Sequence, residues 1–416
     1  MRLATRLTEV VRTPAEPVLD LARAEVAKAG AGGSHVLRWG IVAANDRTFT
    51  LELATAEDAG PARQVARTAD PASGTPGTHV AMVVPTGVGA EVGGFLGDAG
   101  PWSRVLESVA DTVIVHPNVV NAADFYTGGD RSLYVDGLTL DEFFAGRVRL
   151  ARRPRPPRVG VVLDQLPPAL HRRLVNAVNA MRTVGGVDIA AYATCAEKVR
   201  VRTERSAVGH FVGTVDNPEV LFAAVDSVVG AGAEVIAGVS AITGAGSEAV
   251  FAHYDGHGPN PVGAIEALIS RAVTWQTGLP CAHAPAFVEG VGQRDEIIDP
   301  RAAAEVASGT GLPCVLQGLR FTPSAATGIG VADLTAVIVP FSCAGGAPAI
   351  AAADFGVPLI AVRGNATTVG IGADVLALPS TVVVDGYADA VAYVAAQRAG
   401  VSWAALSHPT DLVTEF

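Results

Sequence analysis

The chain has 416 residues, of which 49% are apolar and 17% are charged, and its formal net charge is −11. This composition excludes a disordered chain, which would combine low hydrophobicity with high charge. The negative balance argues against nucleic acid and anionic membranes as partners, because both are bound by basic surfaces.

No secretory signal is evident, because charged residues and a proline interrupt residues 1–18. The most apolar stretch, 334–362, is divided by prolines and glycines, which indicates buried strands and a helix rather than a membrane span. The four cysteines show no CxxC or Cys/His spacing that would suggest zinc. We expect a cytoplasmic protein with no metal and no cofactor.

The first 151 residues predict an N-terminal α/β domain that begins with a helix and a hairpin. The hairpin is indicated by two alternating stretches, 35–43 and 48–54, that flank Asn45-Asp46. The expected elements are, in chain order, a helix over 15–28, the hairpin, a strand over 79–85, a helix over 102–110, a strand over 112–116, a short strand near 133–135 and a helix over 140–144.

A proline-rich basic segment, residues 152–158, predicts a linker. Residues 159–416 then predict a C-terminal domain in which strands and helices alternate, so we expect Rossmann-like, mostly parallel sheets with flanking helices. Its expected elements are strand 159–163, helix 169–182, strand 188–194, helix 218–230, strand 234–239, a helix from 260 to about 275, and strands at 277–282, 310–316 and 355–362.

Ligands of parallel α/β sheets bind at the carboxyl ends of the strands. One such place is the first glycine-rich loop, which follows the strand over 79–85. Glycines there allow a backbone to approach an anion, but a tight structural turn explains them equally well. The candidate anion-binding residues of this loop are Thr86, Gly87, Gly89 and Glu91.

A second glycine-rich loop follows the apolar run 334–340, and we expect its thiol to be reactive. Cys343 would stand at a strand end before a helix start, where the thiol pKa is lowered. The alternative is a core cysteine in a packing turn. Residues of this loop and of the next strand end that would hold a carboxylate or phosphate are Ser342, Gly345, Gly346, Arg363, Asn365 and Thr367.

Further candidates follow other strands. His116, Asn118 and Asn121 form a polar cluster after the strand over 112–116. His283 is a candidate general base, or else an interior histidine. Asp255 and His257 stand in a loop that would be a catalytic loop or a plain surface loop. Two further thiols, Cys281 and Cys314, follow Gly-Leu-Pro and are expected in the core at strand beginnings.

Three stretches carry a resemblance to the bacterial family called domain of unknown function 3326. They are the loop from Val84 to Asp98, the segment from His116 to Asp136, and Pro280–Pro285 after a Pro-Val-Gly-Ala-Ile-Glu-Ala helix. The family implies no reaction. The segment 216–236 resembles the aspartate/glutamate racemase superfamily, which uses two facing cysteines, although Ser240 stands near the position of the first thiol.

These features favour a cofactor-independent isomerase or lyase acting on a small carboxylate, with Cys343 as nucleophile or acid/base and His283 or His257 as proton partner. Two alternatives stay open, a transferase or epimerase for a phosphorylated or nucleotide-linked substrate, and a non-catalytic metabolite-binding protein. The expected partner is a small anionic substrate. The sequence does not decide whether the protein is a monomer or a homo-oligomer.

Overall fold

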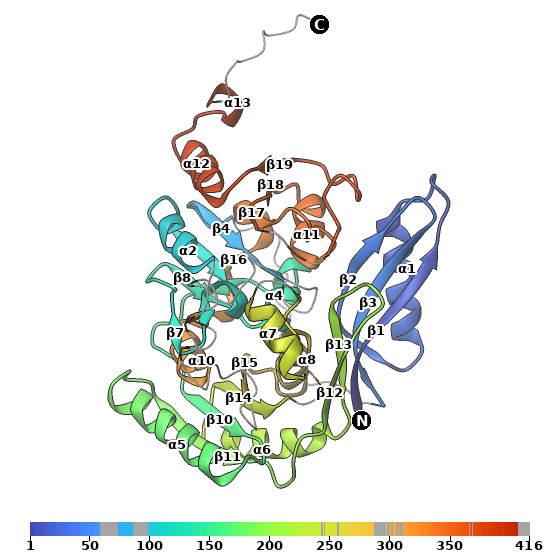
Figure 1. Ribbon diagram of the computed structural model, residues 1–416. Helices are drawn as coiled ribbons and strands as arrows, with labels where there is room; N and C mark the ends of the chain where they lie inside the picture. The colour runs from blue at the N-terminus through green and yellow to red at the C-terminus, as the bar shows by residue number, and fades with distance from the viewer. Residues whose placement is uncertain are drawn as a thin grey trace, which may run out of the picture.

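The protein is an α/β structure with two parallel sheets and one large antiparallel sheet (Figure 1). This computed structural model describes residues 1–58, 74–85, 99–242, 244, 246–255, 258–286, 297, 300, 303–304, 307, 311–365, 367 and 369–406. The fold class predicted from the alternation of strands and helices is confirmed as α/β with several parallel sheets.

The first parallel sheet has six strands. In spatial order they are β19 (Thr381–Val384), β18 (Leu359–Val362), β17 (Leu334–Pro340), β4 (His79–Met82), β5 (Thr112–Val115) and β8 (Ser132–Tyr134). Helices α2 (Gly100–Leu106) and α12 (Tyr387–Arg398) pack together on one face, and α4 (Gly137–Phe144) and α11 (Ala347–Asp354) on the other. Because both faces are covered, its strands are nearly continuous apolar runs.

The second parallel sheet has four strands. In spatial order they are β11 (Ile189–Thr194), β10 (Val159–Leu163), β14 (Val235–Ala241) and β15 (Cys281–Ala286). Helices α5 (Pro168–Thr183) and α10 (Leu312–Leu319) contact each other on one side of it, and α6 (Pro218–Gly230) and α8 (Gly263–Thr277) on the other.

The antiparallel sheet was only partly predicted. In spatial order its strands are β12 (Val201–Arg205), β13 (Phe211–Val215), β1 (Arg2–Val11), β3 (Thr48–Glu57) and β2 (His35–Ala44). The β2–β3 hairpin is confirmed, and the Asn45 side chain accepts hydrogen bonds from the backbone N–H groups of Arg47 and Thr48 in its turn. Helix α1 (Val18–Ala31) contacts β2 and β3, and α8 contacts β1, β2 and β13.

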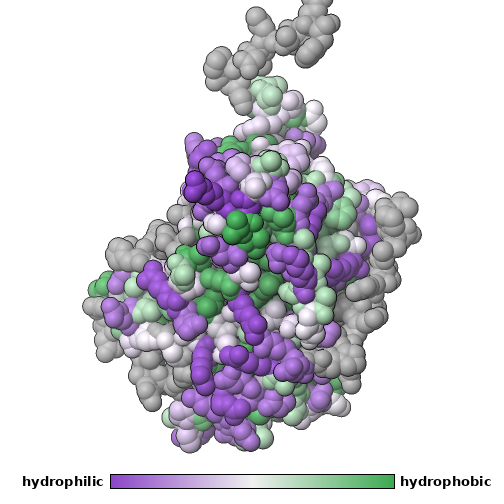
Figure 2. Space-filling view, turned by 90° about the vertical axis from the view of Figure 1, so that its right-hand side faces the viewer, coloured by the Kyte–Doolittle hydropathy of each residue, from purple (hydrophilic) through white to green (hydrophobic). Residues whose placement is uncertain are grey.

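The face of the molecule on the side of β1, β2 and β3 is mixed in character. Hydrophobic residues gather near its centre, and hydrophilic residues border them above and below (Figure 2). The smaller elements of the structure are α3 (Pro117–Val120), α7 (Ser247–Tyr254), α13 (Trp403–Leu406), β6 (Asn121–Ala122), β7 (Phe125–Tyr126), β9 (Leu150–Ala151) and β16 (Ser324–Ile329). Within the described ranges, no helix combines the length and apolar character that crossing a membrane requires.

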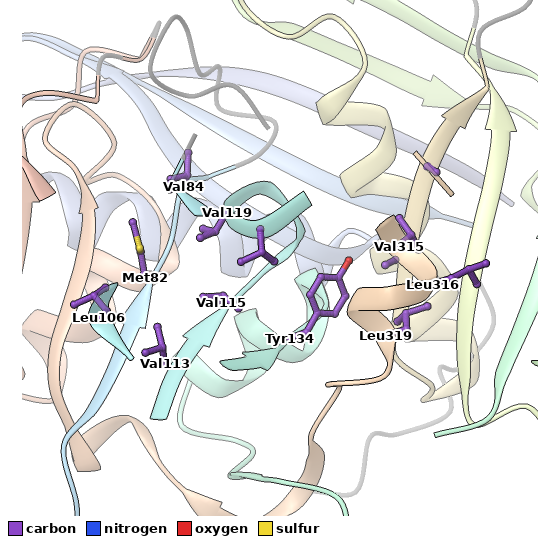
Figure 3. Packing of buried hydrophobic residues seen from close by; sticks show 14 of the residues in the cluster. Met82, Val84, Leu106, Val113, Val115, Val119, Tyr134, Val315, Leu316 and Leu319 are labelled. Carbon is purple, nitrogen blue, oxygen red and sulfur yellow. The ribbon is translucent and has the colours of Figure 1, made fainter. Parts of the chain in front are cut away.

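A continuous apolar core joins the two parallel sheets (Figure 3). Met82 and Val113 contribute from the six-stranded sheet, and Leu316 and Leu319 contribute from α10, which packs on the four-stranded sheet. Tyr134 lies between these groups, and a Cβ added at Gly318 of α10 would lie 2.6 Å from its ring. The glycine therefore lets α10 approach β8 closely enough to close the core.

The chain passes between the two parallel sheets more than once. After β4, β5 and β8 it crosses residues 152–158 and builds the four-stranded sheet, then returns to add β17, β18 and β19 beside β4. A boundary at 152–158 therefore does not divide the two sheets into an N-terminal and a C-terminal half. The segment itself is fixed by Arg155, whose guanidinium donates to both carboxylate oxygens of Glu234.

The strand expected at 310–316 is wrong. Residues 312–319 form α10, and Pro313 stands in its first turn, where a missing N–H costs no hydrogen bond. Gly-Leu-Pro thus precedes a strand at Cys281 but opens a helix here, so Cys314 is a buried helical residue rather than the first residue of a strand.

Candidate functional site

A cavity of about 150 Å³ lies where all three large sheets meet. Its walls come from the carboxyl ends of β4 and β5, from α7, α8 and β15, from the first residues of α4, α10 and α11, and from Arg38 of β2. A single water occupies roughly 10–15 Å³ on a comparable measure. The cavity therefore has room for a small metabolite.

Several helices begin at this cavity. Gly137 of α4, Gly263 of α8, Gly311 before α10 and Gly346 before α11 all line it. The first N–H groups of a helix lack partners within the helix and carry partial positive charge. The helix starts therefore favour an anion, although the N–H groups of Gly263 and Thr139 are already bonded to the side chains of Asn260 and Asp136.

His283 and Glu266 form a buried pair on the cavity wall. His283 lies in the middle of β15, and its Nδ1 is 3.3 Å from Oε1 of Glu266 on α8. Its side chain is 1% exposed, and Nε2 has no hydrogen-bond partner among the described residues. Gly238 of β14 stands opposite His283 and leaves space for the ring.

Burial shifts the pKa of the carboxyl in this pair. Burial raises the pKa of the Glu266 carboxyl, and the contact with His283 opposes that rise. When Nδ1 carries the imidazole proton it donates to Glu266, which leaves a lone pair on the buried Nε2. This is the arrangement of a histidine oriented by a carboxylate for proton transfer.

Arg271 adds a cation to the same wall. It lies on α8 five residues after Glu266, and its Nε donates to Oδ2 of Asp141 on α4 at 2.7 Å. A Cβ at Gly137 would lie 2.7 Å from Nη1 of Arg271, so only glycine leaves this space to the guanidinium. The side chain is 10% exposed and is held in one orientation by Asp141.

The polar cluster after β5 lines the cavity as well. The backbone N–H of Val84 donates to Nε2 of His116 at 3.1 Å, and Asn118 donates to the carbonyl of Val84 at 2.9 Å. Burial, together with the charges of Arg271 and Arg38, lowers the pKa of His116 to about 3. His116 is therefore neutral, with its proton on Nδ1.

Asn121 and His253 complete the polar lining. Asn121 donates to the hydroxyl of Tyr134 at 3.0 Å, while its own Oδ1 has no partner in the described part of the chain. His253 of α7 donates through Nδ1 to the carbonyl of Gly258 at 3.1 Å. Burial lowers the pKa of His253 to about 4, so this imidazole is neutral too.

The second glycine-rich loop lies mostly outside the cavity. Of its candidates only Gly346 is a lining residue. Gly345 is required for packing, because its carbonyl accepts from the N–H of Ile41 and a Cβ there would clash with the Ile41 carbonyl. Asn365 is buried and donates to the hydroxyl of Tyr387 at 2.7 Å, and the exposed Arg363 stacks over the ring of Phe341.

The structure gives no support to Cys343 as a reactive thiol. Burial raises its pKa to about 12, a shift that the hydrogen bond with Thr367 only partly opposes. Ser342 also contacts the Thr367 hydroxyl, at 2.6 Å, so these three side chains satisfy one another away from the cavity. The expected lowering of the pKa by the helix start is outweighed because the thiol is 4% exposed and desolvated.

Of the other expected site residues, one lies outside the cavity lining and five lie outside the described residues. Asp255 is exposed after α7 and is not a lining residue, although its neighbour Tyr254 is one. Thr86, Gly87, Gly89, Glu91 and His257 lie outside the described residues. Cys281 does line the cavity, and burial raises the pKa of its thiol well above the ordinary value, which agrees with an inert core cysteine.

The lining residues that sequence reasoning missed include Arg38, His253, Glu266 and Arg271. A usable signal existed on α8, where Gly263, Glu266 and Ser270 repeat at helical spacing within an otherwise apolar helix. Arg38 gave none, because an arginine in an alternating strand normally faces solvent.

The racemase arrangement of two facing thiols is absent from this cavity. Ser240 lies in β14 of the four-stranded sheet and Cys343 follows β17 of the six-stranded sheet, and neither is a lining residue. Among the described residues, no group of three or more His, Cys, Asp or Glu side chains is arranged to hold a metal ion.

Comparison with known proteins places the chain in a family. A Synechococcus protein named as an uncharacterized lipoprotein is 35% identical over 335 residues, which cover 78% of this chain and 92% of that protein. No solved structure matches. The family model described as protein of unknown function (DUF3326) matches residues 79–407, which include β4, β5, α8, β15 and the starts of α4, α10 and α11. The chain therefore belongs to the DUF3326 family.

Proposed function

We propose that this protein is an isomerase or lyase that acts on a small carboxylate in the cavity, with His283 as the proton-transferring residue. The proposal keeps the reaction class expected from the sequence and moves the chemistry from Cys343 to His283. The observation that carries it is His283, a cavity-lining residue whose buried Nε2 has no partner among the described residues while Nδ1 contacts Glu266.

Arg271 is the carboxylate-binding residue of the proposal. A guanidinium donates two parallel hydrogen bonds to a carboxylate, and the low exposure of Arg271 strengthens them. The starts of α4 and α11 add N–H groups of the same polarity. A carboxylate held there places its neighbouring carbon in the cavity that His283 also lines.

The chemistry follows from these two groups. Nε2 of His283 takes a proton from the carbon next to the bound carboxylate, and Arg271 stabilises the negative charge that spreads onto the carboxylate oxygens. In an isomerase, protonated His283 returns the proton to carbon. In a lyase, the electron pair forms a carbon–carbon double bond, a group on the next carbon leaves, and the proton from His283 neutralises it.

Proton exchange tests the proposal without knowledge of the full substrate. A panel of small carboxylates is incubated with the protein in D₂O, and loss of the C–H signal beside the carboxylate is followed by NMR. We expect His283→Gln to slow exchange by about 10²–10⁴-fold, the usual contribution of a general base. His171→Gln is the matched control, because His171 lies on α5 with its ring near Thr194, outside the cavity.

Binding distinguishes catalysis from mere capture of a metabolite. We expect His283→Gln to bind the exchanged carboxylate with a Kd close to that of the wild type, because Arg271 is unchanged. A carboxylate that binds tightly to the wild-type protein and is never exchanged would contradict the proposal and favour a non-catalytic metabolite-binding protein.

A further inference from the structure

We infer that the ligand of this cavity is a small dianion, recognised by Arg38 and Arg271 together. The inference rests on the proposed function only in placing the ligand in this cavity. Arg38 comes from β2 of the antiparallel sheet, far in sequence from every glycine-rich loop, and it lines the cavity with a side chain that is 10% exposed.

Arg38 is held from behind by a buried network. Its Nη1 donates to Oε1 of Glu52 at 2.8 Å, and Oε2 of the same carboxylate is 2.5 Å from Nε2 of His210. The side chains of Glu52 and His210 are 2% and 1% exposed. One carboxylate is thus shared between two donors, and the shared contact fixes the guanidinium of Arg38 against β3 while its edge reaches the cavity.

Both guanidiniums retain unused donors. A guanidinium has five N–H groups. Among the described residues, Arg38 donates to Glu52 alone, and Arg271 donates to Asp141 and to the carbonyl of Ala267. Each therefore keeps enough N–H groups for a two-pronged contact with one anionic group.

The two cations act on the same part of the cavity. Arg38, Arg271 and His116 all line this cavity, and the charges of both arginines lower the pKa of His116. His116 is neutral and adds no charge of its own. Two guanidiniums that line one cavity repel each other, and a ligand with a single negative charge can pair well with only one of them. A ligand with two negative charges balances both.

Glu52 and Asp141 do not remove this preference. Asp141, which also lines the cavity, accepts from Nε of Arg271, and Glu52 accepts from Nη1 of Arg38, so each carboxylate leaves other donors of its arginine unused. The carboxylate of Glu266 is engaged with His283. The cavity therefore favours an incoming dianion, either a dicarboxylate or a phosphate-bearing molecule.

Matched ligands test the inference by calorimetric titration of the full chain. Malonate, succinate and glutarate are compared with propionate, butyrate and valerate, which have the same carbon counts and one charge fewer, and inorganic phosphate forms a third arm. We expect at least one dicarboxylate, or phosphate, to bind roughly tenfold or more tightly than every monocarboxylate. A dicarboxylate preference identifies the dicarboxylate source, and tighter phosphate binding identifies the phosphate source.

The variants assign the preference to the two residues. Arg38→Met combined with Glu52→Gln removes both buried charges at once, which a fold tolerates better than one orphaned charge. We expect this double variant to lose the preference for the dianion and to keep monocarboxylate binding, whereas Arg271→Met weakens both. Arg38→Lys retains the positive charge but lacks the paired N–H donors of the guanidinium. It is a second, milder variant and should retain part of the preference.

The failure of this inference is distinguishable from failure of the proposed function. Equal binding of dicarboxylates, phosphate and monocarboxylates, or no binding of any probe at 10 mM, would overturn the inference. So would an unchanged preference in a folded Arg38 variant. A dianion preference in a protein that shows no proton exchange would instead support the inference and contradict the proposed enzymatic function.

Discussion

The structure predicts how much unfolding free energy this protein loses at acidic pH. His116 is 7% exposed, and burial together with the charges of Arg271 and Arg38 lowers its pKa to about 3. In the unfolded chain the pKa of a histidine is about 6.5. Between these two values the unfolded state binds more protons, so stability falls as the pH falls from about 6.5 towards 3.

The magnitude at pH 5 depends little on the folded-state value. That pH lies about 1.5 units below the pKa of the unfolded chain, and each unit corresponds to about 1.4 kcal/mol. His116 should therefore cost the protein about 2 kcal/mol of unfolding free energy between pH 7 and pH 5. His253 has the same sign of shift, with a folded pKa of about 4, and should add a similar loss.

Urea unfolding at pH 7 and pH 5 measures this loss in the wild-type protein and in His116→Gln. The glutamine oxygen can still accept the hydrogen bond from Val84, so the variant retains the contact but no longer titrates. We expect the difference in unfolding free energy between the two pH values to be about 2 kcal/mol smaller in the variant. An equal difference in both proteins would refute the assignment of His116 as a buried neutral histidine.

Three further predictions follow from the same structure. Alkylation of the native protein over a pH series, followed by peptide mass, should leave Cys343 unlabelled until unfolding, because its thiol is buried with a pKa of about 12; labelling at neutral pH would restore the thiol mechanism. Gly137→Ala should weaken carboxylate binding about tenfold in a titration, because the new Cβ displaces Arg271, whereas Gly230→Ala, with open space at its Cβ, should bind normally. The cytoplasmic location stays a prediction that cell fractionation checks, and recovery of the protein in the membrane fraction would contradict it.

The elements with strong local signals were predictable. Helix α6 begins at Pro218 after Asn217 and ends at Gly230, as its start and stop residues indicate. Helix α8 begins three residues after Asn260, because the Asn260 side chain accepts from the N–H groups of Val262 and Gly263 first. Strand β1 was missed because its buried and exposed residues do not alternate regularly.

The candidate site was only partly predictable for a physical reason. The rule that ligands bind at strand ends identified His116, Asn118, Asn121, Gly346 and His283, although His283 lies inside β15 rather than after it. The same rule cannot say which strand ends belong to one cavity, because that depends on how separate sheets pack. Arg38 reaches the site only through the contact of β2 with the turn before α11, which no local pattern records.

The pairing of β4 with β17 has a consequence for how the chain is made. Val80 pairs with Ala336, and the whole four-stranded sheet lies between them in sequence. As the chain leaves the ribosome, one edge of β4 stays open until β17 has emerged, and the loop that must close is long. A fragment that stops at residue 158 should therefore expose this edge and aggregate. When the last third of the full chain is released slowly, the chain should depend on chaperones until β17 has emerged.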